Sequence, residues 1–313
     1  MSTSGFDIPV LFLVYNRPSM TETVFQVLRE LRPSRLFLSA DGPRTDRPQD
    51  ALLCANVREI VTKVDWPCEV KTLFRSENLG SKFAVSGALD WFFEHVEAGI
   101  ILEDDCLPTA GFFTYCAEML NRYATDDRIM HVNGTNFLRG KEFHFQGYYY
   151  YSKLPHPWGW ASWRRAWKRY DFKMEHFDLF ASEGMIRRLT ENPFYQGAYL
   201  KLLTEAKKGL IDCWDYQWFY TIWLNDALVI TPARNMVTNL GFGADATNTT
   251  YTDTRLGGMK RHELRRLTYD DSGLVNRAAD AYAMQIKFSE GQFTLISRIY
   301  RKLRSMINSL KPR

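Results

Sequence analysis

The chain has 313 residues, of which 45% are hydrophobic and 24% charged, enough for one large α/β domain or two small ones with a buried core. No apolar run approaches the ~20 residues needed to cross a bilayer, and the first residues show no signal-peptide pattern, so we expect a cytoplasmic protein. The five cysteines are odd in number and form no C-x-x-C pair, which favours reduced thiols over a disulfide framework or a zinc site.

The net charge of +4 is unevenly distributed along the chain. After Glu290 there is no acidic residue, whereas six Lys and Arg residues lie within 291–313. The rest of the chain then carries 34 basic and 36 acidic residues. A nucleic-acid-binding domain would itself be basic, so we expect no nucleic-acid partner.

Short apolar strands alternate with amphipathic helices in the first half of the chain. Strands are predicted at 10–14, 36–40, 69–74 and 99–103, and helices with one apolar face follow the first three of them. This alternation predicts a parallel sheet with right-handed crossovers. Neither G-x-G-x-x-G nor G-x-x-x-x-G-K-[ST] follows the first strand, which argues against a Rossmann dinucleotide site and a P-loop.

The second half has a different texture. A helix from Thr109, a strand at 129–132, a helix opening near 212–218 and a strand at 228–230 are predicted. The segment 148–163 is dense in aromatics, Pro and Gly, and fits either an exposed loop that stacks on sugars or a plug of core aromatics. A helix at 162–170 would carry a basic stripe of Arg164, Arg165, Lys168 and Arg169. The glycine-rich segment 239–249 suits a mobile lid.

Three consecutive acids, Glu103, Asp104 and Asp105, end the apolar strand at 99–103. Adjacent carboxylates repel one another, so a chain that gathers them at a strand end usually has a cation for them. Mg²⁺ and Mn²⁺ take one or two carboxylates together with substrate phosphates. Because open α/β sheets bind ligands beyond the carboxyl ends of their strands, we expect a metal-assisted phosphate site here, with a solvated acidic turn as the alternative.

The chain resembles the GT-A nucleotide-sugar glycosyltransferases, specifically bacterial relatives of the N-acetylglucosaminyltransferase I type, from about residue 9 to 249. The resemblance rests on ordered blocks: Asn16-Arg17, Asp41, the helix 81–93, Glu103-Asp104-Asp105 with Phe112-Phe113, Trp158-Gly159-Trp160, Trp214-Asp215 and 239–243. It implies an α/β fold of the GT-A type, a single domain with a mixed, mostly parallel sheet flanked by helices. We assign 1–285 to this domain, with a nucleotide-sugar half at 1–135 and an acceptor half at 136–285, and 286–313 to a C-terminal amphipathic helical appendage.

The resemblance also implies roles for single residues. Asp105 matches a direct ligand of Mn²⁺ or Mg²⁺, and Asp215 matches the general-base region, with an ordinary first-turn helix acid as its alternative. Asp212, Asp245 and Asp253 are reserve candidates for the base. The donor-binding positions are Arg17 near the nucleotide, Asp41 at the base edge, Lys82, and Glu103 and Asp104 at sugar or ribose hydroxyls. For Asp41, a plain Asp-Gly-Pro turn is equally open, and Asn16 departs from the acid of other members.

The implied activity is metal-dependent, inverting transfer of a sugar from a nucleoside diphosphate donor to a glycan hydroxyl, in bacterial surface polysaccharide or lipopolysaccharide assembly. One alternative is a sugar nucleotidyltransferase, although the residues 14–18 lack the glycines of a triphosphate loop. The other is a non-catalytic carbohydrate-binding protein on the same fold.

The tail carries its own pattern. Apolar residues recur at three- and four-residue steps from Phe293 to Leu310, beside unbalanced bases, which is typical of a helix lying on an anionic membrane surface. A lipid-linked acceptor would explain such a helix in a peripheral enzyme on the inner membrane face. The alternative is that the stripe packs on the enzyme itself or on a second subunit of a homodimer.

Overall fold

The computed structural model describes residues 5–242, 256, 258–264 and 266–289. Its main feature is an eight-stranded sheet in the order β3-β2-β1-β4-β8-β6-β9-β7. β8 and β7 run against the other six strands. The strands are β1 Val10–Val14, β2 Arg35–Ala40, β3 Glu69–Phe74, β4 Ala98–Glu103, β6 Ile129–Asn133, β7 Tyr149–Ser152, β8 Trp160–Trp163 and β9 Leu228–Pro232.

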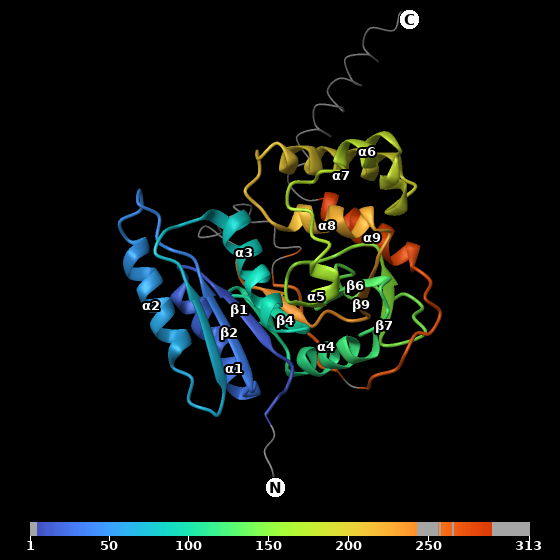
Figure 1. Cartoon of the computed structure of the whole chain (residues 1–313). Helices are drawn as coiled ribbons and strands as arrows, with labels where there is room; N and C mark the ends of the chain where they lie inside the picture. Colours follow the sequence, from blue (N-terminus) through green and yellow to red (C-terminus); the bar gives the residue numbers. More distant parts are fainter. Residues whose placement is uncertain (1–4, 243–255, 257, 265, 290–313) are drawn as a thin grey trace, which may run out of the picture.

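Helices cover both faces of this sheet (Figure 1). Along β1, Val10, Phe12 and Val14 join the core under α1, α2 and α4, whereas Leu11 and Leu13 join the core under α3 and α5 to α8. This alternation follows the two-residue period of a strand. The helices are α1 Pro18–Leu31, α2 Asp50–Thr62, α3 Gly80–His95, α4 Ala110–Arg122, α5 Arg164–Trp167, α6 Phe177–Ser182, α7 Pro193–Lys207, α8 Asp215–Leu224 and α9 Arg277–Ser289, with a 3₁₀ turn at Met185–Arg188.

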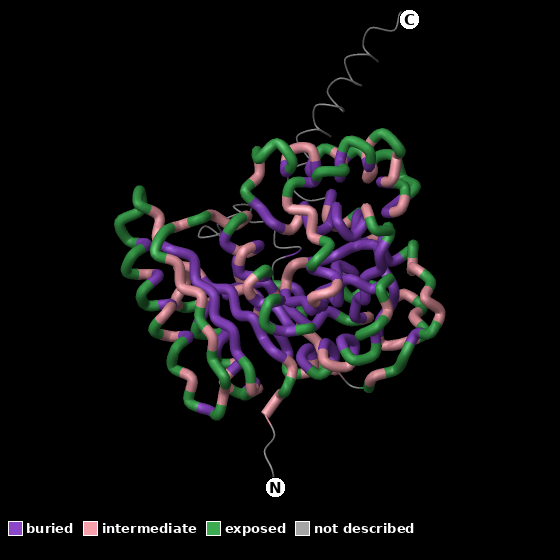
Figure 2. Tube along the Cα trace, viewed as in Figure 1, coloured by how far each residue is buried: buried purple, intermediate pink, exposed green. Residues whose placement is uncertain are grey.

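The expectation of a mixed, mostly parallel sheet flanked by helices is therefore confirmed. Figure 2 shows why the strands at 10–14, 36–40 and 99–103 are so apolar: the centre of the sheet is buried on both faces. A second, two-stranded antiparallel sheet joins β5 (Cys106–Pro108) to β10 (Val237–Asn239). It holds the chain just beyond the end of β4.

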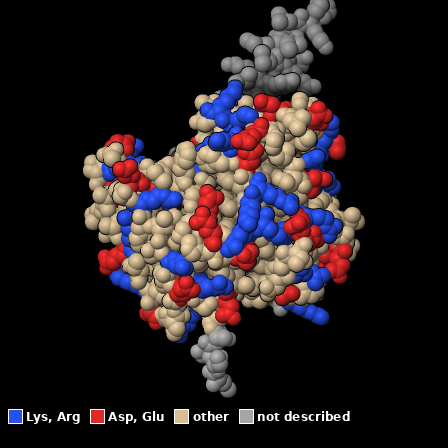
Figure 3. Space-filling view, viewed as in Figure 1, with Lys and Arg blue, Asp and Glu red and all other residues tan. Residues whose placement is uncertain are grey.

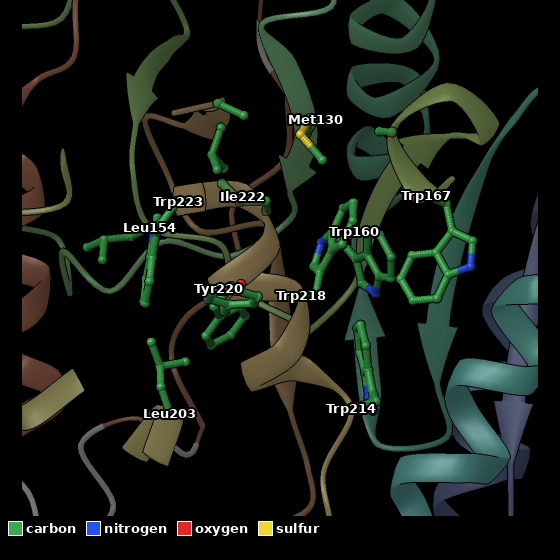
Figure 4. Close-up of a cluster of buried hydrophobic side chains, with 14 of the residues drawn as sticks. Met130, Leu154, Trp160, Trp167, Leu203, Trp214, Trp218, Tyr220, Ile222 and Trp223 are labelled. Atoms are coloured by element: carbon green, nitrogen blue, oxygen red, sulfur yellow. The ribbon is translucent and has the colours of Figure 1, made fainter. Parts of the chain in front are cut away.

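The aromatic segment at 148–163 belongs to the core. Its residues form β7 and β8, and Tyr149, Tyr150 and Trp160 are fully buried. Trp160 stacks on Trp214, the residue before α8, with ring centroids 5.5 Å apart, and Figure 4 shows the surrounding cluster. The interpretation as an exposed sugar-stacking loop is therefore wrong for these buried rings.

The predicted helix at 162–170 is shorter than expected, because only Arg164–Trp167 is helical. Arg164 donates to the carbonyl oxygens of Phe93 and Val96 at the end of α3, and Arg165 donates to those of Tyr123, Ala124 and Ile129 beyond α4. Cations at helix C-termini are favoured by the helix dipole. The two arginines therefore bind carbonyl oxygens at and beyond the C-terminal ends of α3 and α4, and they do not form a free basic stripe. Charges of both signs adjoin on the face in Figure 3.

The boundary placed at 286 falls inside α9, which runs without interruption from Arg277 to Ser289. The remainder of the predicted appendage, 290–313, lies outside the described residues. Within the described part of the chain, no helix has the length and apolarity to cross a membrane.

Candidate active site

The three acids occupy the turn that joins β4 to β5, at the carboxyl edge of the large sheet. Glu103 is the last residue of β4 and is partly exposed, whereas Asp104 and Asp105 are buried. The strand delivers them there because Ile100, Ile101 and Leu102 are fully buried in the sheet. Asp105 is also fixed through its backbone, since its carbonyl accepts from Leu240 N at 2.7 Å.

Arg17 reaches the same edge from the loop after β1. Strands β1 and β4 are parallel neighbours with Leu13 opposite Glu103, so the residues that follow them meet. Arg17 Nη1 lies 3.2 Å from Asp104 Oδ1 and 2.9 Å from Asp105 Oδ2. The backbone N–H of Tyr15 adds a hydrogen bond of 3.2 Å to Asp104 Oδ2.

The loop that carries Arg17 is held in place by Asp50, the first residue of α2. The Asp50 carboxylate accepts from Arg44 Nε at 2.6 Å, from the Tyr15 hydroxyl at 2.8 Å and from Asn16 Nδ2 at 3.0 Å. The hydrogen bond from Arg44 holds the pKa of Asp50 below its ordinary value. Asn16, where the family resemblance leads us to expect an acid, thus serves to orient the loop that presents Arg17.

The site carries an excess of negative charge. Burial and the neighbouring Asp105 raise the pKa of Asp104 to about 7, although Arg17 opposes the shift. Burial, Asp105, Asp104 and Asp215 likewise raise the pKa of Glu103. The guanidinium of Arg17 balances only part of the negative charge of these crowded carboxylates. A further cation would therefore stabilise their ionised forms.

The segment 239–241 closes over Asp105. Asn239 Nδ2 lies 3.4 Å from Asp105 Oδ1, and a Cβ at Gly241 would fall 2.2 Å from Asp105 Oδ2. Only glycine fits this close to that oxygen. The sequence predicted this segment as part of a lid and as one block of the family resemblance, and it did not predict the contact with Asp105; Gly241 was the available signal for close approach. The rest of the predicted lid, 243–249, lies outside the described residues.

Asp215 is the first residue of α8, and its charge acts on the same cluster. Its charge contributes to the raised pKa of Glu103, and burial raises its own pKa. Trp214, stacked on Trp160, fixes the start of the helix. Trp158 meets Phe242 edge to face at 5.3 Å, so three separate blocks of the sequence converge around the acids.

Lys82 lies on the α8 side of the site. Its Nζ stands 4.6 Å from the centre of the Phe172 ring. In the amide orientation that satisfies its neighbours, the Gln217 oxygen accepts from Lys82 Nζ at 3.3 Å and the Gln217 nitrogen donates to Cys213 O at 3.0 Å. Lys82 is thus tied to the helix that carries Asp215.

Asp41 and Asp212 both serve the N-terminus of α3. Asp41 accepts from the backbone N–H groups of Leu79 and Gly80, and Asp212 accepts from those of Ser81 and Lys82 at 3.0 Å. Together they satisfy donors that a helix start leaves without partners. For Asp41 this geometry favours the turn-and-cap interpretation; contact with a nucleotide base stays a prediction. The other reserve candidates, Asp245 and Asp253, lie outside the described residues.

Whether these residues fit a metal follows from their chemistry. Among the described residues, no three His, Cys, Asp or Glu side chains gather to hold an ion by themselves. Carboxylate oxygens nevertheless suit a hard divalent cation that takes part of its coordination from a ligand's phosphates. The site fits such an ion on that condition, and the role of Asp105 as its protein ligand stays a prediction.

The fold and site define a mixed α/β protein with an acidic cluster at the carboxyl edge of its sheet. No family model matches the chain, and no curated protein does. Among solved structures, the chain is similar to HddC from Yersinia pseudotuberculosis, with a TM-score of 0.31 and 9% identity over 50% of this chain and 77% of that one. It is also similar to S. aureus TarS 1–349, with a TM-score of 0.37 and 9% identity over 74% of this chain and 59% of that one. Likeness this distant carries no argument about activity.

Proposed function

We propose that the protein is a metal-dependent inverting glycosyltransferase that moves a sugar from a nucleoside diphosphate donor to a hydroxyl of a glycan acceptor. The observation that carries this proposal is the acidic cluster at the end of β4, which forms ion pairs with Arg17 and whose Glu103 has its pKa raised in part by the charge of Asp215. An acid-rich edge with one guanidinium suits a metal–diphosphate pair, and Asp215 supplies a base beside it.

Each residue then has a task. Asp105 would hold Mn²⁺ or Mg²⁺, which would stabilise the charge that develops on the leaving diphosphate. Arg17 orients Asp104 and Asp105 and adds positive charge on the donor side. Glu103 and Asp104 offer hydrogen-bond acceptors for sugar or ribose hydroxyls, and Lys82 binds the nucleotide-sugar donor. Asp41 supports the loop next to the nucleotide base.

Asp215 acts as the general base. An acceptor hydroxyl must lose a proton as it attacks the anomeric carbon, and a carboxylate within hydrogen-bond reach can take it. Burial raises the pKa of Asp215, which makes its carboxylate a stronger base than a solvated one. A single displacement assisted by one base inverts the anomeric configuration.

The setting of the reaction is a further part of the proposal. The acceptor belongs to bacterial surface polysaccharide or lipopolysaccharide assembly and is lipid-linked, and the enzyme works at the cytoplasmic face of the membrane through 293–313. That segment lies outside the described residues, and the support for this step is its basic amphipathic sequence.

The test is to incubate the protein with a panel of nucleotide sugars and Mn²⁺ or Mg²⁺ and to measure donor hydrolysis and thermal shift. We expect one donor class to be hydrolysed slowly in a metal-dependent way, and Asp105→Asn to abolish this turnover without unfolding the chain. Pyrophosphate release from a nucleoside triphosphate and a sugar phosphate would instead establish a nucleotidyltransferase. Undiminished turnover by Asp105→Asn across a Mn²⁺ titration would remove Asp105 as the ligand.

A further inference from the structure

Helix α9 brings a lysine to the site that the proposed mechanism does not use. The helix is anchored at its start, where the buried carboxylate of Asp280 accepts from Ser152 Oγ at 2.6 Å and from Lys153 N at 2.9 Å. At its other end, Phe288 stacks on Tyr195 with ring centroids 5.6 Å apart. These contacts fix α9 beside α8 (Figure 1) and set the position of Lys287.

Lys287 projects its ammonium group into a cage of three aromatic rings. Nζ lies 5.2 Å from the ring centre of Tyr199 on α7, and 5.8 Å and 5.2 Å from those of Tyr216 and Phe219 on α8. Aromatic faces attract a cation, so this cage favours the charged form of the lysine. Among the described residues, Nζ makes no hydrogen bond and no ion pair within 4 Å.

The cage adjoins Asp215, since Tyr216 is the next residue. Burial raises the pKa of Asp215, and the charge of Lys287 is the largest influence that opposes this rise. The effect is mutual, because burial lowers the pKa of Lys287 while Asp215 opposes the fall. The other titratable groups that interact with this pair are the Cys213 thiol, His156, Glu103 and the Tyr170 hydroxyl, together with the ring hydroxyls of the cage.

We propose that Lys287 is a positioning residue for the transfer reaction, which holds Asp215 as an ionised base from a fixed aromatic cage. This inference rests on the proposed function for its consequence in catalysis. The cage keeps the ammonium from folding onto the carboxylate as a close ion pair, so the Asp215 oxygens stay available to the acceptor hydroxyl. If Lys287 served only to anchor α9, its charge would not affect the ionisation of Asp215.

The first test compares kcat–pH profiles of Lys287→Met, which removes the charge, and Lys287→Arg, which keeps it. Without the cation, the pKa of Asp215 rises, so the acid limb of kcat should move up by about one pH unit, and activity should recover at higher pH. Lys287→Arg should restore the limb, and KM for the donor should not change. A uniform loss across all pH values would overturn the proposal and leave an anchoring role.

A matched control is Lys207→Met. Lys207 also sits over an aromatic ring, with Nζ 5.4 Å from the centre of Phe177, but it pairs with Asp178 and the carbonyl oxygen of Met174. Its replacement removes a lysine from an aromatic ring without changing the charge near Asp215, so the kcat–pH profile should not shift.

The second test does not need transferase activity. In a double-mutant cycle measured by urea unfolding at pH 7, Asp215→Asn should favour folding more in the Lys287→Met chain than in the natural chain, by at least about twofold in the unfolding constant. Additive effects would refute the coupling itself. Coupling without detectable transfer would refute the proposed function and keep the charge pair. If Lys287→Met does not fold, Lys287→Gln serves in both tests.

Discussion

At the scale of single residues, Asp215 is distinguished by its surroundings. It is the first residue of α8 and follows the stacked Trp214, its charge raises the pKa of Glu103, and the charge of Lys287 opposes the rise of its own pKa. A solvent-exposed first-turn acid would gain only from the helix dipole. A partly exposed acid whose charge interacts with both a carboxylate cluster and a caged cation has the environment of a functional group.

We predict that Asp215→Asn keeps donor binding and lowers kcat by about 10²–10⁴-fold, the usual contribution of a general base. The change is isosteric and leaves Trp214 and the metal edge in place. Steady-state kinetics with a donor-binding titration would measure both quantities. A weaker donor affinity with unchanged kcat would make Asp215 a binding residue.

Asp212→Asn is the control for this prediction. The Asp212 carboxylate is already engaged by the N–H groups of Ser81 and Lys82, so its loss should disturb α3 more than proton transfer. We therefore expect a small change in kcat and a measurable fall in stability. A larger loss of kcat than for Asp215→Asn would exchange the two assignments.

At the scale of elements, the N-terminus of α3 joins two parts of the chain. Asp41 follows β2 and Asp212 precedes α8, and both carboxylates bind successive N–H groups of the same helix start. Satisfying these donors stabilises the helix, and it also holds the loop after β2 and the loop before α8 at the same helix start.

We predict that Asp41→Ala lowers the free energy of unfolding by about 1–2 kcal/mol through loss of this cap. Urea unfolding of the variant would measure it. Asp46→Ala is the matched control, because Asp46 lies in the same loop but its side chain is 77% exposed and its one ion pair with a described residue is a long one, to Arg47. An unchanged stability together with a raised donor Kd would mean that Asp41 binds the nucleotide and does not cap.

At the scale of the whole molecule, α9 completes the body and the basic segment follows it. The helix is held by Asp280 and Phe288, so a chain that ends at Ser289 keeps every contact described for α9. The six bases of 291–313 are removed in that chain.

We predict that the full chain co-sediments with vesicles containing anionic lipid, that salt weakens this binding, and that the chain ending at Ser289 stays in the supernatant while active on a soluble acceptor. Zwitterionic vesicles are the control. If the shortened chain unfolds or falls from a dimer to a monomer, the segment packs on protein and the membrane proposal is wrong.

The elements that the sequence determined by itself are those with strong local patterns. Continuous apolar runs predicted β1, β2 and β4, and three adjacent acids marked the edge of the sheet before any contact was known. These inferences succeed because strand burial and carboxylate crowding are properties of neighbouring residues.

Only the tertiary structure decided the rest, because it depends on residues far apart in the chain. Whether the aromatic segment at 148–163 faced solvent or core depended on partners such as Trp214 and Trp218. Asp41 and Asp212, whose carboxylates meet at the start of α3, lie 171 residues apart in the sequence, and no local pattern predicts that they meet. No local sequence pattern marks Lys287 as a functional residue, because the aromatic rings that surround it come from two other helices, α7 and α8.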